Sequence, residues 1–255
     1  MLFSRAAVTI PAVLFSCLVA CSGTSNSPEG IATEDALQGG TKDTGDPAVG
    51  LVWFQGGGFC SGTLISPTVV LTAGHCVKDP IDGFYTGTGT ATKTIGATPS
   101  RGFVKHAVLE AKAHPTFDPA FGSCPNAGVD IGLIHLAAPL AGVTPIGFNS
   151  GSAPALGSSC SAVGYGTHGQ GSKTTFEQKR SGTETVAQTL STAIGVKFGT
   201  AIADRGDSGG PLVFGSVVVG TTSCSAAPGD PAAVNYYARV DQAAAWIHQT
   251  LGTWH

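Results

Sequence analysis

Charged side chains are scarce in this sequence. Only 11% of its 255 residues are Asp, Glu, Lys or Arg, and the formal net charge is −3. A chain with so few basic residues offers no cationic surface for the phosphates of a nucleic acid, so no nucleic-acid partner is expected. Long apolar runs are scarce too. The longest lies near the N-terminus, and at about 15 residues it is short of the ~20 that a membrane-spanning helix needs.

Glycine and proline are abundant instead, with 37 and 15 copies. This composition suits a turn-rich protein built from strands better than a helical one. From residue 51 onward, short apolar runs alternate with turn residues, which predicts an all-β barrel or sandwich rather than alternating βαβ units. The predicted strands lie at 51–54, 63–66, 69–71, 103–111, 131–136, 161–165, 183–189, 211–214, 216–222 and 236–240. A helix is predicted at about 242–251, with Asp241 placed to cap it.

Residues 1–20 have the features of an export signal. Arg5 precedes the apolar run, which is of the length of a signal-peptide core. The run ends in LVAC at 18–21, which resembles the lipobox of bacterial lipoproteins and predicts a lipid on Cys21. Cleavage near the same point without a lipid is the alternative. Residues 21–36 are rich in Ser, Gly, Thr and Glu and are predicted to be a flexible tether or a propeptide. The remaining chain is therefore expected to be exported, either lipid-anchored in the bacterial cell envelope or extracellular.

Cysteine usage agrees with export. The chain has seven cysteines, of which one lies inside the signal and one is Cys21. The other five are Cys60, Cys76, Cys124, Cys160 and Cys224. In an oxidising compartment most of these should pair, but an odd number leaves one over.

The hexapeptide GDSGGP at 206–211 carries the strongest chemical signal. A serine hydroxyl is a poor nucleophile at neutral pH, so it needs a base and a site for the oxyanion that it generates. The flanking glycines allow a tight turn in which the backbone N–H groups of Gly206 and Ser208 point at that oxyanion. The alternative is a glycine-rich turn without chemistry.

Two further patterns supply the partners that such a serine needs. TAGHC at 72–76 places His75 at the end of an apolar strand, where a neutral imidazole can take the proton of Ser208. Asp130 opens the apolar run DIGLIHL, and a buried carboxylate there can hold the imidazole in the right tautomer. Alone, His75 could be structural and Asp130 a solvated strand-end residue. Together, the three patterns indicate a nucleophilic triad.

These motifs resemble those of the chymotrypsin/trypsin family of serine proteases, from about residue 37 to the C-terminus. LQGGT at 37–41 resembles the family's mature N-terminus, and the order His, Asp, Ser is that of the family. Other similar segments are FCSGTLI (59–65), GYG (164–166) and YARV (237–240). The resemblance implies a peptidase domain over 37–255, with two six-stranded antiparallel β-barrels, at about 37–140 and 141–240, and the C-terminal helix. The active site would lie in the cleft between the barrels.

The resemblance also implies proteolytic activation and a pattern of disulfides. A cut between residues 36 and 37 would free the amine of Leu37 to pair with Asp207. A bridge between Cys60 and Cys76 would brace the histidine turn. The usual partner of Cys160 is missing, because Phe214 stands in its place. Cys224 could pair with Cys124 or with Cys160, and both pairings are left open.

The specificity pocket implied by the resemblance is formed by Ile202, Ala203, Ser223 and Asn235. Trypsins carry an Asp where this chain has Ile202, and relatives often have a Gly where it has Asn235. A cationic side chain would be buried there without a countercharge, which is costly, so the pocket is predicted to prefer uncharged side chains. If the loop shifts register, the carboxylate of Asp204 would enter the pocket and reverse that preference.

The prediction is thus a monomeric serine endopeptidase that acts on proteins or peptides through an acyl-enzyme, with no cofactor and no metal. Two other functions remain as alternatives: an inactive homologue that serves as a binding module, and an esterase or acyl transferase that uses the same triad.

Overall fold

The computed structural model describes residues 37–88, 91–92, 99, 102–118, 124–125, 128–166, 175–176, 178–225, 227, 230 and 232–254. The predicted signal (1–20), the tether or propeptide (21–36) and Cys21 lie outside the described residues.

The elements are β1 (Thr41–Lys42), β2 (Val49–Phe54), β3 (Phe59–Ser66), β4 (Val69–Thr72), the 3-10 helix η1 (Gly74–Val77), β5 (Ile81–Gly87), β6 (Ala91–Thr92), β7 (Phe103–His106), β8 (Val108–Ala113), β9 (Gly132–Leu136), β10 (Gly147–Phe148), β11 (Ser159–Gly164), β12 (Thr175–Phe176), β13 (Arg180–Thr189), β14 (Ala193–Phe198), β15 (Pro211–Phe214), β16 (Val217–Ser225), β17 (Asn235–Arg239) and α1 (Ala244–Leu251). The all-β prediction with one C-terminal helix is confirmed.

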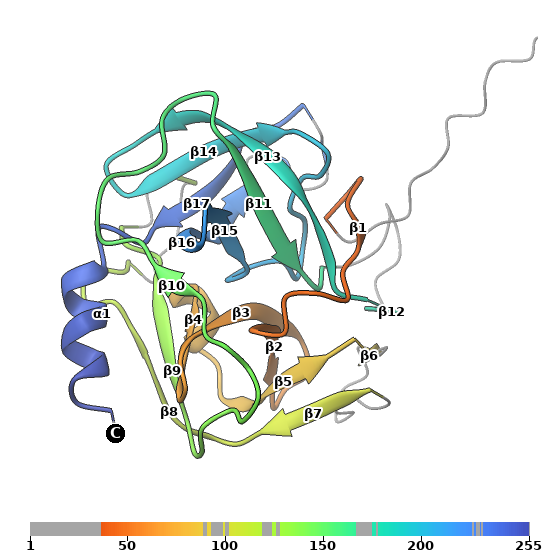
Figure 1. Cartoon of the computed structure of the whole chain (residues 1–255), viewed down its shortest axis with the longest axis vertical. Helices are drawn as coiled ribbons and strands as arrows, with labels where there is room; N and C mark the ends of the chain where they lie inside the picture. The colour runs from red at the N-terminus through yellow and green to blue at the C-terminus, as the bar shows by residue number, and fades with distance from the viewer. Residues whose placement is uncertain are drawn as a thin grey trace, which may run out of the picture. The chain divides into compact units, whose positions relative to one another are not determined.

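The strands of the C-terminal half form a closed barrel (Figure 1). Its strands run in the order β13-β11-β15-β16-β17-β14, and a pairing between β13 and β14 closes the ring. The closing pair is antiparallel and joins Glu184 to Phe198 and Val186 to Val196. Closure leaves no free sheet edge in this ring and creates an interior that only one face of each strand can reach.

The strands of the N-terminal half form a curled sheet of seven strands in the order β7-β5-β2-β3-β4-β9-β8. The predicted strand at 103–111 is split here into β7 and β8, which follow each other in the chain but lie at opposite ends of the sheet. Among the described residues no pairing joins these two ends, so this sheet remains a half-barrel. It carries β4 and β9, the strands that lead to and from the predicted catalytic residues of this half.

Apolar side chains from both sheets and from α1 meet in one core. Val69 and Leu71 of the first sheet share it with Val218 and Ala238 of the second and with Ile247 of α1. Each Val, Leu or Ile side chain of this core contributes about 1.5–3 kcal/mol when it is fully removed from water. This shared core fixes the position of β16 relative to β4, and these strands lie on the two sides of the site.

Helix α1 begins without the predicted cap. Ala243 occupies the N-cap position and no side chain caps the helix there. The Asp241 carboxylate instead pairs with the Arg239 guanidinium, at 2.5 and 3.0 Å, because an arginine fork satisfies a carboxylate better than a single N–H does. Beyond the helix, the Trp254 ring stacks on the His135 ring at 5.0 Å between centroids.

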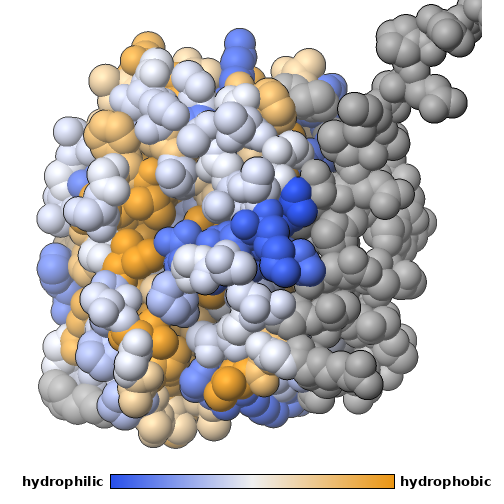
Figure 2. Space-filling model, turned by 45° about the vertical axis from the view of Figure 1, so that its right-hand side comes forward, coloured by the Kyte–Doolittle hydropathy of each residue, from blue (hydrophilic) through white to orange (hydrophobic). Residues whose placement is uncertain are grey.

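The surface reflects the low charge content of the chain. On the face shown in Figure 2, apolar residues reach the surface in separate groups between weakly polar ones. Within the described ranges, no helix is both long enough and apolar enough to cross a membrane.

Candidate active site

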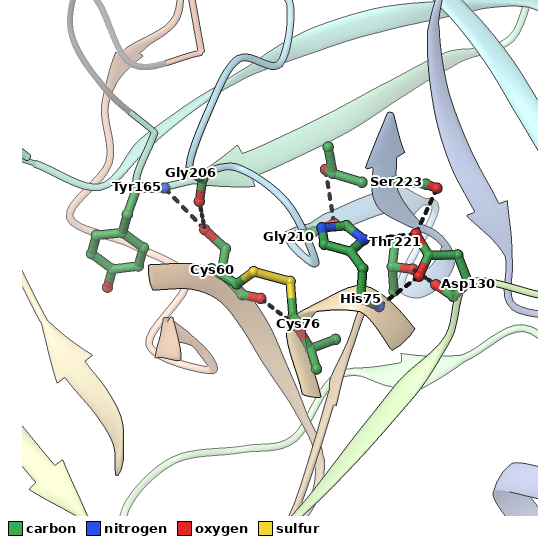
Figure 3. Close-up of a disulfide and its surroundings, with 12 residues drawn as sticks. Cys60, His75, Cys76, Asp130, Tyr165, Gly206, Gly210, Thr221 and Ser223 are labelled. Atoms are coloured by element: carbon green, nitrogen blue, oxygen red, sulfur yellow. Dashed lines mark hydrogen bonds and ion pairs between the residues drawn. A yellow bond between two sulfur atoms is a disulfide. The ribbon is translucent and has the colours of Figure 1, made fainter. Parts of the chain in front are cut away.

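His75 is held in the short 3-10 turn η1, which follows the buried strand β4. A disulfide joins the next residue, Cys76, to Cys60 of β3 (Figure 3). Closing a loop of this length, with a sequence separation of 16, stabilises a fold by roughly 3 kcal/mol on chain-entropy arguments. The histidine therefore sits on a turn that is tied covalently to the neighbouring strand.

His75 and Asp130 are joined by two hydrogen bonds. Nδ1 of His75 lies 2.8 Å from Oδ2 of Asp130, and the backbone N–H of His75 donates to Oδ1 at 2.8 Å. Asp130 is only 1% exposed. The Ser223 hydroxyl also donates to Oδ2, at 2.7 Å. With its carboxylate fixed from several directions, Asp130 orients the imidazole so that Nε2 faces away from it.

The segment 206–211 forms the tight turn that its glycines predicted. Gly206 and Gly209 have φ values of +95° and +77°, which side chains with a Cβ rarely adopt. A Cβ on Gly209 would also overlap Thr72 Oγ1 and the Ser61 carbonyl. Among the described residues, no acceptor is recorded for the backbone N–H of Gly206 or of Ser208.

Ser61 is a residue of this site that the sequence analysis missed. Its N–H donates to the Ser208 carbonyl at 2.7 Å, and its hydroxyl donates to the Gly206 carbonyl at 3.1 Å. The same hydroxyl accepts the N–H of Tyr165 at 3.2 Å. Ser61 thus joins β3 of the first sheet to the serine turn of the second. The signal for it lay in the segment FCSGTLI, which was used only for the family resemblance.

A cavity of about 240 Å³ lies beside the histidine turn and the serine turn. Its lining includes His75 and Ser208, together with Ala203, Ser223 and Asn235. These are the predicted triad histidine and serine and three of the four predicted pocket residues. Ile202, the fourth, is not among its lining residues in the described part of the chain.

Ile202 is fully buried, and its N–H donates to the Gln38 carbonyl at 3.0 Å. The Asn235 side chain instead reaches the cavity wall and donates from Nδ2 to the Ala203 carbonyl at 2.6 Å. The base of the cavity is therefore set by the Asn235–Ala203 pair. Asp204, the alternative considered for this position, also lines the cavity, and its carboxylate accepts a hydrogen bond from Gln38 Nε2 at 3.2 Å.

Asp207 lies beneath the serine turn and is 1% exposed. Its carboxylate accepts backbone N–H groups from Leu37 at 3.3 Å, from Gly166 at 2.8 Å and from Asp204 at 2.9 Å. Burial raises the pKa of this carboxyl to about 7 despite these donors. Leu37, itself 1% exposed, is thus already docked at the carboxylate.

A second disulfide joins Cys124 to Cys224 of β16, at a sequence separation of 100. Of the two pairings left open by the sequence, the structure contains this one. Cys160 is a free, buried cysteine. Burial, followed by the charge of Glu184, raises the pKa of its thiol to about 11, so it is an unreactive thiol.

Cys60, His75 and Cys76 are also close enough to share a metal ion, since their ligand atoms lie within 4.8 Å of one another. The two sulfurs are bonded to each other, however, and a disulfide sulfur does not serve as a thiolate ligand. The group is therefore explained by the disulfide.

Comparison with known proteins gives consistent matches. The protein family described as Trypsin matches residues 38–247. Trypsin beta of Drosophila erecta is 28% identical over 232 residues, which cover 83% of this chain and 87% of that protein. Trypsin of Saccharopolyspora erythraea is 27% identical and covers 75% of this chain and 86% of its own length.

Among solved structures, neuropsin, a serine protease expressed in the limbic system of mouse brain, superposes with a TM-score of 0.64 at 24% identity. The match covers 81% of this chain and 95% of neuropsin. At this identity the likeness concerns the fold alone, and it confirms the predicted chymotrypsin-like architecture. Because the family match spans both sheets and the residues of the cavity, the chain belongs to the trypsin family of serine proteases.

Proposed function

We propose that the chain is a serine endopeptidase in which Ser208 is the nucleophile, His75 the general base and Asp130 the residue that orients the base. The observation that carries the proposal is the 2.8 Å contact between His75 Nδ1 and Asp130 Oδ2, beside a cavity that Ser208 also lines. A buried carboxylate on Nδ1 keeps the imidazole proton on that nitrogen, so that Nε2 is the nitrogen that accepts a proton, as nucleophilic catalysis by an alcohol requires.

In the proposed reaction Ser208 Oγ attacks the substrate carbonyl carbon while its proton passes to His75 Nε2. The N–H groups of Gly206 and Ser208 stabilise the oxyanion, a contribution worth about 10²–10³ in turnover for one donor. The imidazolium then protonates the leaving amine, and the acyl group remains on Ser208. Water releases it by the same steps in reverse.

Activation is proposed to follow a cut between residues 36 and 37. The new ammonium of Leu37 would replace its neutral amide at Asp207, whose carboxylate accepts only backbone N–H groups among the described residues. Placing a cation there offsets the burial of the carboxylate charge. This would stabilise the serine turn that Asp207 belongs to.

The substrate side chain is proposed to be uncharged and of small or medium size. The Asn235–Ala203 hydrogen bond crosses the cavity base, where a glycine would leave room for a longer side chain. The protein is further proposed to be an exported monomer, held at the envelope by a lipid on Cys21 or released without one.

A fluorophosphonate probe tests the central proposal, since it reacts only with an activated serine. Labelling of the processed protein, lost in Ser208→Ala, is the expected result, together with digestion of casein. An unlabelled wild-type protein would indicate an inactive homologue that acts as a binding module. Labelling without casein digestion would indicate an esterase or acyl transferase.

A further inference from the structure

A carboxyl group that the proposed mechanism does not use lies behind the cavity wall. Glu184, in the middle of β13, is fully buried, with 0% exposure. Its Oε1 accepts the N–H of Ala203 at 2.9 Å, while Oε2 has no hydrogen-bond partner among the described residues. A buried acid with one oxygen unpaired is costly when ionised, so its presence at this position calls for a physical reason.

Among the described residues, the groups that face Glu184 carry no positive charge, although Arg205 lines the cavity on the other side of the wall. They are the Tyr237 hydroxyl of β17, the Asp207 carboxyl of the serine turn and the Cys160 thiol of β11. The Tyr237 hydroxyl is near enough to act on the carboxyl, yet it does not meet it with the geometry of a hydrogen bond. Burial raises the pKa of Glu184 to about 8, so the group is mostly neutral at neutral pH.

A short chain of hydrogen bonds connects this carboxyl to the cavity. Glu184 holds the N–H of Ala203, and the Ala203 carbonyl accepts Nδ2 of Asn235 at 2.6 Å. Ala203 and Asn235 both line the cavity. Oδ1 of Asn235 is also buried without a partner among the described residues, so a residue of the cavity lining carries an unsatisfied acceptor. This acceptor, together with the Glu184 carboxylate once it is ionised, favours a ligand group that carries hydrogen-bond donors or positive charge.

We propose that Glu184 is a positioning residue that sets the charge preference of the substrate pocket: neutral, it leaves a pocket for uncharged side chains, and ionised, it admits a lysine or arginine side chain. The inference rests on the proposed peptidase function, because it concerns the side chain that this pocket receives. It also places the acid behind Ala203, on β13, and not at Ile202, the position at which trypsins carry their aspartate.

Ionisation changes the charge of the pocket without changing its shape. The carboxyl oxygen that accepts the Ala203 N–H can do so whether the group is neutral or ionised. A cation in the cavity offsets the burial of the charge, so cation binding and ionisation favour each other. This coupling is reciprocal, and a cation that binds near neutral pH must therefore drive release of a proton from Glu184.

The test compares two peptides that differ only in having lysine or its uncharged isostere norleucine before the cleaved bond. In processed wild-type enzyme, the ratio of kcat/KM for lysine over norleucine should rise about tenfold between pH 6.5 and pH 9.5. A tenfold change is expected if the lysine side chain shifts the pKa of Glu184 by about one unit. In Glu184→Gln, which keeps the oxygen that bonds to Ala203, the ratio should stay flat. Every other titratable group is present in both enzymes and cannot produce this difference.

A binding measurement tests the inference without turnover. Binding of p-aminobenzamidine to Ser208→Ala protein at pH 7, followed by calorimetry in two buffers of different ionisation enthalpy, should release close to one proton, and clearly less in the same protein with Glu184→Gln. Binding without proton release, no binding, or an equal rise of the peptide ratio in Glu184→Gln would overturn the role of Glu184. Proton release without cleavage of either peptide would instead overturn the proposed peptidase function and leave the role of Glu184 supported.

Discussion

The backbone nitrogen of Leu37 lies 3.3 Å from Oδ2 of Asp207, in a site where both residues are almost completely buried. Residue 37 thus lies under the serine turn already in the uncut chain, where its nitrogen belongs to a peptide bond. What the proposed cut would add is charge rather than position. Asp207 would then change from a carboxyl with a raised pKa to one that faces an ammonium.

The first prediction is that the uncut protein loses stability as the pH rises, and that the cut between residues 36 and 37 reduces this loss. In uncut protein the folded pKa of Asp207, about 7, exceeds the ordinary value of 3.8. The protonated Asp207 carboxyl therefore makes its full contribution to the free energy of unfolding below about pH 4. This contribution is lost as the pH rises through about 7. After the cut the ammonium lowers this pKa, and the loss should shrink. Calorimetric Tm values of Ser208→Ala protein, uncut and cut, would show it.

The difference between the two forms isolates Asp207, because Glu184 titrates in both. Its pKa is raised to about 8, so it adds its own decline of stability from about pH 4.5 to about pH 8. Parallel Tm curves for the uncut and cut forms would contradict an ion pair at Asp207.

The second prediction concerns the hydroxyl that supports Asp130. Ser223→Ala removes the 2.7 Å hydrogen bond to Oδ2, leaving the carboxylate that orients His75 less firmly held. A hydrogen bond to a charged group contributes about 1.5–3 kcal/mol, so kcat/KM should fall at least about tenfold. Ser216→Ala, at the exposed turn before β16, is the control and should retain most of the activity. Equal losses in the two variants would mean that the contact with Asp130 is unimportant.

The third prediction concerns backbone conformation in the serine turn. Gly206→Ala should lower kcat by about 10²–10³, the effect of losing one oxyanion donor. The added Cβ forces φ away from +95° and meets the Phe59 ring. Gly215→Ala is the matched control, since Gly215 has φ +64° but open space around its Cα. It should cost stability alone, about 1–3 kcal/mol. A Gly206→Ala enzyme with full activity would argue against an oxyanion site at this turn.

The fourth prediction separates the two cysteine pairings. Replacing Cys124 and Cys224 by serine should lower the free energy of unfolding by roughly 2–5 kcal/mol, because the bridge closes a long loop. Urea unfolding monitored by fluorescence measures it. Cys160→Ser, which removes a free thiol, should have a smaller effect. Peptide mapping that finds Cys160 linked to Cys224 would contradict the structure.

The fifth prediction concerns the size of the substrate side chain. Asn235→Gly removes the side chain that bonds to the Ala203 carbonyl across the cavity base. Cleavage after phenylalanine should then increase relative to cleavage after alanine by about tenfold, because the enlarged cavity can contact more of the phenylalanine side chain. A peptide library digested by both enzymes measures the change. An unchanged profile would show that Asn235 does not limit the pocket.

The local motifs were readable because their chemistry is contained in a few neighbouring residues. The segment 206–211 needs glycines for its positive φ values, and residues 72–76 follow an apolar strand that ends in a histidine. The order of His75, Asp130 and Ser208 supplied the family resemblance. Strands β5 and β14 were not predicted, and β5 contains Asp82 and Gly83, which are typical of turns. Pairing on both sides of β5, to β2 and to β7, outweighs that local preference.

The sequence by itself determined the all-β class, the C-terminal helix and the residues with nucleophilic or basic chemistry, because composition and short motifs carry that information. Only the tertiary structure decided that Glu184 points into a closed barrel behind Ala203, that Ser61 braces the serine turn, and that Ile202 lies away from the cavity. The reason is that the buried face of a strand depends on its partners. For Glu184 one of those partners is β14, whose pairing with β13 closes the ring. The sequence of β13 alone does not show which face of the strand lies inside the closed barrel.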